Sequence, residues 1–124
     1  MGNSSLTAKY EIYKDKQEKF RFRLKAANNK IVVVSEDYEN KTNCINGVKS
    51  IQQNCKANVE DKTLGQKISD PKYEIFVDSD LMFRFNLVAP NGRIVGSSEA
   101  YKSKQGSKNG IEAVKIAVMP KSLI

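Results

Sequence analysis

The strongest constraint on the fold is an internal duplication. Shifting the sequence against itself by 63 positions aligns residues 9–55 with residues 72–118 without a gap. Nineteen of the 47 aligned positions are identical. A match of this length at a single offset indicates two copies of one supersecondary unit, so every structural prediction can be made twice.

Two short units of this kind are expected to share one core. We predict repeat one at residues 9–64 and repeat two at residues 72–124, with a short polar linker at residues 65–71 between them. Because a unit of roughly 60 residues buries too little apolar surface to be stable alone, we expect one domain over residues 1–124. We also expect a monomer with internal pseudo-two-fold symmetry, since each repeat supplies the other's missing half.

Each repeat begins with a hydrophobic pattern of period two. Tyr10 and Ile12 alternate with polar residues, and Phe22 and Leu24 do the same further along. Such alternation is typical of half-buried strands, and the polar residues between the two runs favour a hairpin. A third apolar run at residues 31–35 completes three antiparallel strands, and the same pattern recurs in repeat two.

The pattern then changes to the period of a helix. Four residues of repeat one recur at spacings of four, three and four: Cys44, Val48, Ile51 and Cys55. Together with the equivalent residues of repeat two, they predict one amphipathic helix of about three to four turns in each repeat. The segments that follow, residues 57–64 and 118–124, are predicted as a fourth strand of each repeat.

Two pairs of equivalent residues give further detail on the helices. Asn40 and Ser103 precede them and are predicted as N-caps. Gly47 and Gly110 lie inside them, although glycine costs roughly 1 kcal/mol relative to alanine in a helix interior. A glycine at the same point of both helices therefore indicates close packing against a neighbouring element.

Several runs of residues resemble a known family. They are FRFRLKAANNKI, SEDY and INGVKSI in repeat one, and FRFNLVAPNGRI, SEAY and KNGIEAVKIAV in repeat two. Over residues 9–118 the chain resembles the tandem-repeat YegP family, small bacterial and archaeal proteins classed as a domain of unknown function. It departs from the family pattern at Asn29, where glycine is usual, at Cys55, where a small residue is usual, and in the first eight residues.

The resemblance implies an α+β fold. Two tandem beta(3)-alpha-beta repeats would form one antiparallel sheet with both helices on one face. The C-terminal strands would be either exchanged between the repeats or kept within them. The family brings no established activity, so the resemblance predicts structure alone.

The charge of the chain is positive but diffuse. There are 21 Lys and Arg against 14 Asp and Glu, a formal net charge of +7, and only four of the cations are arginines. A polyanionic partner is one explanation of such an excess. Because lysine mostly keeps surfaces hydrated and no basic tail is present, we favour a solvated surface.

The residue types exclude several chemistries. The sequence contains no histidine, and its two cysteines, Cys44 and Cys55, fit neither a redox motif nor a zinc site. We therefore predict no catalytic residues, no metal and no cofactor, and we expect the protein not to be an enzyme. No stretch approaches the roughly 20 apolar residues of a membrane span, and no signal peptide is recognisable, so we expect a cytoplasmic protein without membrane contact.

One group of candidate partner-binding residues lies on the predicted open face of the sheet. This group is Tyr13, Arg21, Arg23, Lys25, Phe76 and Arg84. Basic side chains beside aromatic rings on an open sheet are how several proteins bind single-stranded RNA. The other interpretation is that Glu11 pairs with Arg21, and Glu74 with Arg84, across neighbouring strands of a solvated face. We favour the charge pairs, because the recurring combination is acidic with basic.

A second group belongs to the motif Ser-Glu-x-Tyr, which follows the third strand in each repeat. Its candidates are Glu36, Tyr38, Glu99 and Tyr101. A carboxylate beside a phenol at a strand end suits a small polar ligand. The same residues also suit a turn in which the tyrosine ring packs and its hydroxyl bonds to the backbone, and we favour this structural role.

Taken together, the residues predict a small, non-enzymatic cytoplasmic protein that serves as an interaction or small-ligand-binding module. The open sheet face is predicted as its working surface, with a protein or a small polar ligand as the favoured partner. The alternative is single-stranded nucleic-acid binding on the same basic and aromatic face.

Overall fold

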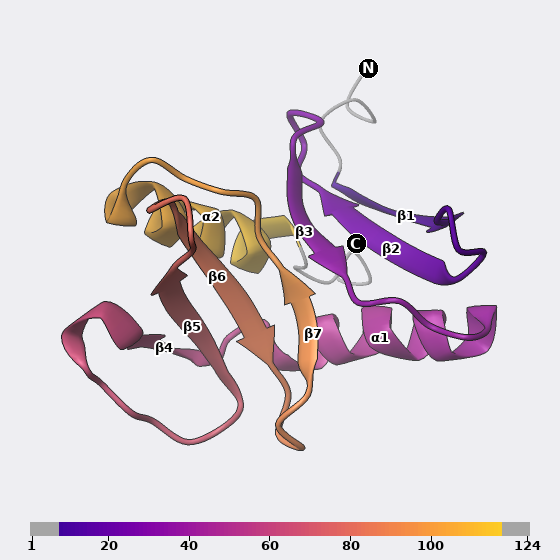
Figure 1. Cartoon of the computed structure of the whole chain (residues 1–124). Coiled ribbons are helices and arrows are strands. Elements are labelled where there is room, and N and C mark those ends of the chain that lie inside the picture. Colours follow the sequence, from indigo (N-terminus) through magenta and orange to yellow (C-terminus); the bar gives the residue numbers. More distant parts are fainter. Residues whose placement is uncertain (1–7, 118–124) are drawn as a thin grey trace.

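The computed structural model describes residues 8–117, and the first three strands and the helix of repeat one recur in repeat two (Figure 1). Repeat one contains β1 (Lys9–Lys14), β2 (Phe20–Lys25), β3 (Ile31–Ser35), α1 (Lys41–Asn54), β4 (Asn58–Asp61) and the short 3-10 helix η2 (Lys62–Leu64). Repeat two contains β5 (Lys72–Val77), β6 (Phe83–Val88), β7 (Ile94–Ser97) and α2 (Lys104–Ala117). The bounds of β5, β6 and α2 are those of β1, β2 and α1 displaced by 63 residues, as the duplication predicted.

Both predicted N-caps are confirmed. The side-chain oxygen of Asn40 accepts a hydrogen bond of 2.8 Å from the backbone N–H of Asn43. The hydroxyl of Ser103 accepts one of 2.9 Å from the N–H of Gly106. Each bond satisfies a donor that the first turn of a helix leaves free, so the sequence determines where α1 and α2 begin.

The strands form a single seven-stranded sheet in the order β1-β2-β3-β7-β6-β5-β4. Neighbouring strands are antiparallel except at one edge, where β4 runs parallel to β5. The prediction of an antiparallel sheet is therefore wrong at this pair, and the sheet is mixed. The reason is the connection: η2 and the linker carry the chain back along β4, so that β5 starts at the same end of the sheet as β4.

The pairing of β4 also joins the two repeats. In sequence β4 belongs to repeat one, but its partner β5 is the first strand of repeat two, with Asn58 opposite Lys72 and Asp61 opposite Ile75. The last strand of repeat one is therefore paired with a strand of repeat two. Whether the C-terminal strands are exchanged between the repeats stays open, because the equivalent segment of repeat two, residues 118–124, lies outside the described residues.

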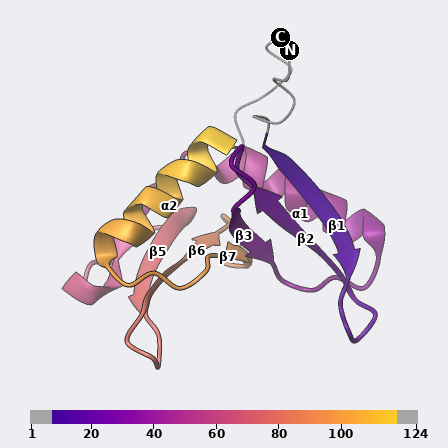
Figure 2. The ribbon, with the colours of Figure 1, turned by 90° about the horizontal axis from the view of Figure 1, so that it is seen from above.

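Both helices lie on the same side of the sheet (Figure 2). α1 contacts β2 and β7, while α2 contacts β2, β3, β5 and β6, so each helix packs on strands of both repeats. The buried side chains between the helices and the sheet form a single hydrophobic core, with the equivalent residues Phe22 and Phe85 both fully buried. The repeats thus share one core, as their size predicted.

The hairpin between β5 and β6 contains a leucine with an unfavourable positive φ angle. Leu81 has φ of 62°, in the left-handed region, and its side chain is 78% exposed, so no packing compensates the unfavourable backbone. A leucine in this region costs roughly 1–2 kcal/mol, whereas asparagine adopts it readily. We expect Leu81→Asn to raise the free energy of unfolding by about 1 kcal/mol in urea denaturation. Ser79→Asn in the same loop is the matched control, and an equal gain there would contradict the explanation.

Candidate functional site

The predicted cations on the open face of repeat one are all held by carboxylates. Arg21 Nε lies 2.8 Å from a carboxylate oxygen of Asp15, and its guanidinium also donates to the carbonyl of Ser35. Glu11 holds both other cations, at 2.8 Å from Arg23 Nε and 3.2 Å from Lys25 Nζ. Arg21 keeps the pKa of the Asp15 carboxyl below its ordinary value, and Arg23 and Lys25 do the same for Glu11.

The charge pairing was predicted, but its partners were wrong. The hairpin closes with Lys14 opposite Phe20, which places Glu11 opposite Arg23 instead of Arg21. Arg21 is then free to reach back to Asp15 in the hairpin loop. Tyr13 lies beside this group, with its ring centre 4.7 Å from the guanidinium carbon of Arg23. The ring is therefore already occupied by a cation of its own repeat.

Repeat two reproduces only part of this arrangement. Arg84 pairs with Asp78 at 2.7 Å, as Arg21 does with Asp15, and it lowers the pKa of that carboxyl. Phe76 lies on the neighbouring strand β5 opposite Arg84 and is only partly exposed. Arg84 was predicted as the ion-pair partner of Glu74. In the structure the Glu74 carboxylate instead accepts a hydrogen bond from the amide of Asn86 at 2.9 Å and pairs with Lys62 at 3.2 Å.

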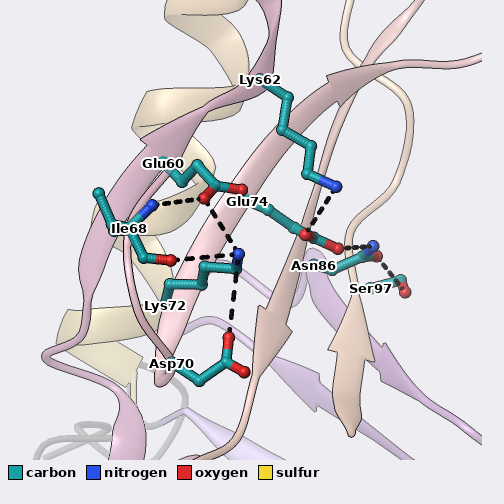
Figure 3. Close-up of polar contacts among 8 residues, drawn as sticks. All are labelled: Glu60, Lys62, Ile68, Asp70, Lys72, Glu74, Asn86 and Ser97. Carbon is teal, nitrogen blue, oxygen red and sulfur yellow. Dashed lines mark hydrogen bonds and ion pairs between the residues drawn. The ribbon is translucent and has the colours of Figure 1, made fainter. Parts of the chain in front are cut away.

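A second set of polar contacts lies at the sheet edge at β4, separate from the contacts of Glu74 (Figure 3). Lys72 Nζ lies 3.0 Å from the buried carboxylate of Glu60, which also accepts the backbone N–H of Ile68 at 2.7 Å. The Ile68 N–H and the Lys72 ammonium hold the pKa of Glu60 below its ordinary value. These contacts bind the linker to the edge strand, so they have a structural role.

The Ser-Glu-x-Tyr motif is built into the sheet through its backbone. The hydroxyl of Ser35 accepts the N–H of Phe22 and donates to the carbonyl of Glu36, and Ser98 does the same in repeat two. The N–H and C=O of Tyr38 both pair with the backbone of Phe20, forming an isolated bridge. Glu36 and Glu99 are exposed.

The tyrosine of the motif packs on the glycine of the following helix. A Cβ atom at Gly47 would lie 2.8 Å from Tyr38 Cζ and 3.0 Å from a ring carbon of Phe22. A Cβ atom at Gly110 would lie at the same two distances from Tyr101 Cζ and from a ring carbon of Phe85. The predicted close packing at both glycines and the packed tyrosine rings are confirmed. Among the described residues, however, neither tyrosine hydroxyl forms the backbone hydrogen bond that was predicted.

Replacement of either glycine tests this packing. Gly47→Ala and Gly110→Ala are each expected to lower the free energy of unfolding by about 1–3 kcal/mol, because the added methyl group overpacks the core. This result would reverse the gain of roughly 1 kcal/mol that alanine brings to an open helix position. Asn46→Ala, on the exposed side of the same turn, is the control and is expected to be neutral or slightly stabilising in the same urea melts. Stabilisation by either glycine substitution would contradict the packing.

A cleft of about 460 Å³ opens beside Tyr38, with walls from both repeats. The first wall is the segment of residues 37–39, which contributes two carboxylates. The second is α1, with the amides of Asn43 and Asn46. The third is the turn between β6 and β7, which contributes Arg93. The cleft is therefore lined by both charge signs and by neutral amides.

Arg93 differs from the other arginines of the chain. Arg21, Arg23 and Arg84 are each bound to a carboxylate, whereas Arg93 has no ion-pair partner among residues 8–117. Burial raises the pKa of the Tyr38 phenol, and the positive charge of Arg93 offsets part of that rise. The groups that line the cleft thus include a guanidinium and a phenol.

The sequence predicted one member of the cleft, Tyr38, and missed its walls. Asp37, Asn43, Asn46 and Arg93 were not among the predicted site residues. A signal was present, because the residues around the tyrosine differ between the repeats while the motif itself recurs. Asp37 and Glu39 correspond to Ala100 and Lys102, 63 positions further on.

Other chemical groups give no further site in the described part of the chain. Both cysteines are free and buried, and burial raises the pKa of the Cys44 thiol. Within residues 8–117, no three His, Cys, Asp or Glu side chains gather where they could hold a metal ion. None of the helices in this range is both long and apolar enough to cross a membrane.

These features define a class: a tandem-repeat α+β protein with one mixed sheet and two helices on one of its faces. The family model described as "Domain of unknown function (DUF1508)" matches the chain twice, at residues 15–61 and 78–118. The chain belongs to this family of uncharacterised proteins, which includes UPF0339 proteins named YegP, as the resemblance predicted.

Individual relatives agree with this assignment. The UPF0339 protein in the ptx operon 5' region of Stutzerimonas stutzeri is 38% identical over 110 residues, which cover 89% of this chain and 88% of that protein. A UPF0339 protein of Treponema denticola is 51% identical over 49 residues, covering 40% of this chain and 84% of that protein. The latter match has the length of a single repeat.

A solved structure shows the same fold. The solution NMR structure of the protein of unknown function yegP from Escherichia coli matches with a TM-score of 0.74 at 31% sequence identity. The match covers 93% of this chain and 89% of that chain. The fold is thus a family property, whereas the side chains of the cleft have to be judged from this sequence.

Proposed function

We propose that the protein is a non-enzymatic binding module of the cytoplasm, and that its ligand is a small polar molecule held in the cleft beside Tyr38. The observation that carries the proposal is the position of Arg93. It is the one arginine without a carboxylate partner in the described part of the chain, and it lines a cleft with walls from both repeats. Clefts with a few converging polar groups are the usual sites for small ligands.

The contacts on the open sheet face favour the cleft over that face. A carboxylate paired with an arginine neutralises part of the positive charge that would attract a phosphate, and Arg21, Arg23 and Arg84 each hold a carboxylate at 2.7–2.8 Å. One face of the Tyr13 ring is likewise taken by the guanidinium of Arg23 and is not open to a base. These contacts weaken the case for single-stranded nucleic acid on this face.

The proposal of a non-enzymatic role rests on residue types and burial. General acid–base and nucleophilic chemistry at neutral pH most often use histidine, which the sequence lacks. A cysteine reacts as its thiolate, and both thiols are buried. Two free thiols also suit the reducing conditions of the cytoplasm.

Amide chemical shifts measured by NMR test the proposal. The intact ¹⁵N-labelled protein would be titrated with four sets of small molecules (amino acids, sugars, nucleosides and simple carboxylic acids) and, separately, with oligouridine. We expect at least one small molecule to shift the amides of Asn43, Asn46 and Arg93, while the amides of β1 and β2 stay in place.

Two results would overturn the proposal. One is the absence of any shift in the cleft across all four sets. The other is a salt-dependent response of Arg21 and Arg23 to oligouridine with no response in the cleft, which would place nucleic-acid binding on the open face.

A further inference from the structure

We infer that the ligand of this cleft is a small zwitterion that carries a carboxylate and an ammonium group, the chemistry of a free amino acid or a dipeptide. The inference rests on the proposed function, because it names the ligand class of the same site. It follows from how the charges of the cleft walls are compensated.

The cleft holds an unpaired charge of each sign. Arg93 stands on the wall formed by repeat two, and Asp37 stands on the wall formed by repeat one. Among residues 8–117 neither side chain has an ion-pair partner, whereas the other carboxylate of the cleft, Glu39, is bound by Lys19. Both side chains are exposed, so water hydrates them when the cleft is empty, and a ligand that pairs with both walls would bring one negative and one positive group.

The donors and acceptors agree with the charges. A guanidinium binds a carboxylate through two parallel hydrogen bonds, and Tyr38, which also lines the cleft, offers a hydroxyl donor. An ammonium group has three donors and no acceptor, so it suits the carboxylate of Asp37. The amides of Asn43 and Asn46 offer both donors and acceptors to a peptide group in the space between.

The second repeat explains why only one such site is expected. At the positions of Asp37 and Glu39 repeat two has Ala100 and Lys102, and at the position of Arg93 repeat one has Lys30. The equivalent surface beside Tyr101 therefore lacks an acidic residue at these positions and cannot receive an ammonium group in the same way. This difference supplies matched controls within the chain.

The test removes one charge of the ligand at a time. Four probes would be titrated into the ¹⁵N-labelled intact protein: L-alanine, Ala-Ala, N-acetyl-Ala-Ala, which lacks the ammonium group, and Ala-Ala amide, which lacks the carboxylate. We expect Ala-Ala or alanine to shift the amides of the cleft, and we expect loss of either charge to weaken that binding by at least about tenfold. The comparison of alanine with Ala-Ala decides between an amino acid and a dipeptide.

Protein variants assign each charge to its wall. Arg93→Met is expected to lower the affinity for the zwitterionic ligand about tenfold. It should leave the weak binding of Ala-Ala amide unchanged, because that probe has no carboxylate for Arg93 to bind. Asp37→Asn is likewise expected to lower the affinity for the zwitterionic ligand about tenfold, and to leave the weak binding of N-acetyl-Ala-Ala, which has no ammonium group, unchanged. The controls are Lys30→Met, at the position equivalent to Arg93, and Glu36→Gln, which is exposed next to the cleft; neither should change binding.

The outcomes separate this inference from the proposed function. If a sugar or nucleoside shifts the cleft amides while none of the four probes does, the inference of a zwitterionic ligand is wrong and the cleft remains the binding site. Equal binding of all three forms of Ala-Ala would also overturn the zwitterion. If nothing shifts the cleft amides, both proposals fail. Because the charges are removed from the ligand as well as from the protein, a variant that does not fold leaves the inference testable.

Discussion

Phe22→Ala and Phe85→Ala are each expected to lower the free energy of unfolding by about 3–5 kcal/mol. Both rings are fully buried between the sheet and a helix, where each approaches the glycine of that helix within contact distance. Phe22 also packs on the rings of Tyr10 and Tyr38, and Phe85 on that of Tyr73. Truncation leaves a cavity that such rigid neighbours cannot fill. Urea denaturation followed by circular dichroism measures the loss.

Arg21→Ala is the matched control for these substitutions. Arg21 is adjacent to Phe22 on β2 but points to the opposite face, where its ion pair with Asp15 is partly exposed. Pairs of this kind contribute at most about 1 kcal/mol, so the variant is expected to lose less than that. A loss at Arg21 as large as that at Phe22 would show that the open face carries part of the stability and that our description of the two faces is wrong.

A fragment of residues 1–66 is expected not to fold as a monomer. It contains all of β4, but within residues 8–117 β4 pairs only with β5, which the fragment lacks. It also loses β7, which supplies Gly96 to the close packing with Val33 and Ile51. The remaining unit of roughly 60 residues would expose a sheet edge on either side of its three other strands.

Size-exclusion chromatography with light scattering and a thermal melt would test the fragment beside the intact chain. We expect either an unfolded fragment or a dimer in which each copy gives β4 to the other, while the intact chain is a monomer that melts cooperatively. A monomeric fragment with its own cooperative melt would contradict the dependence of repeat one on repeat two. A stable dimer of the intact chain would contradict the idea that the duplication replaces dimerisation.

The sequence by itself determined the elements of this protein. Hydrophobic periodicity and capping residues act within a few positions of the chain, and the duplication allowed each pattern to be read twice. For this reason the first three strands of each repeat, the helices, their N-caps and the packed glycines Gly47 and Gly110 could be predicted. The strand predicted at residues 57–64 is a strand only over Asn58–Asp61, because a 3-10 helix follows at Lys62–Leu64, and the strand predicted at residues 118–124 lies outside the described residues. The burial of Phe22 and Phe85 follows from the same alternation.

Only the tertiary structure decided how these elements meet. The parallel pairing of β4 with β5, the partners of Arg21 and Glu74, and the cleft that brings Asp37 near Arg93 depend on register or on segments far apart in the sequence. A shift of two residues in one hairpin changes every cross-strand pair without altering the period-two pattern. Local patterns therefore leave such pairings open, and they become definite only when both repeats close around one core.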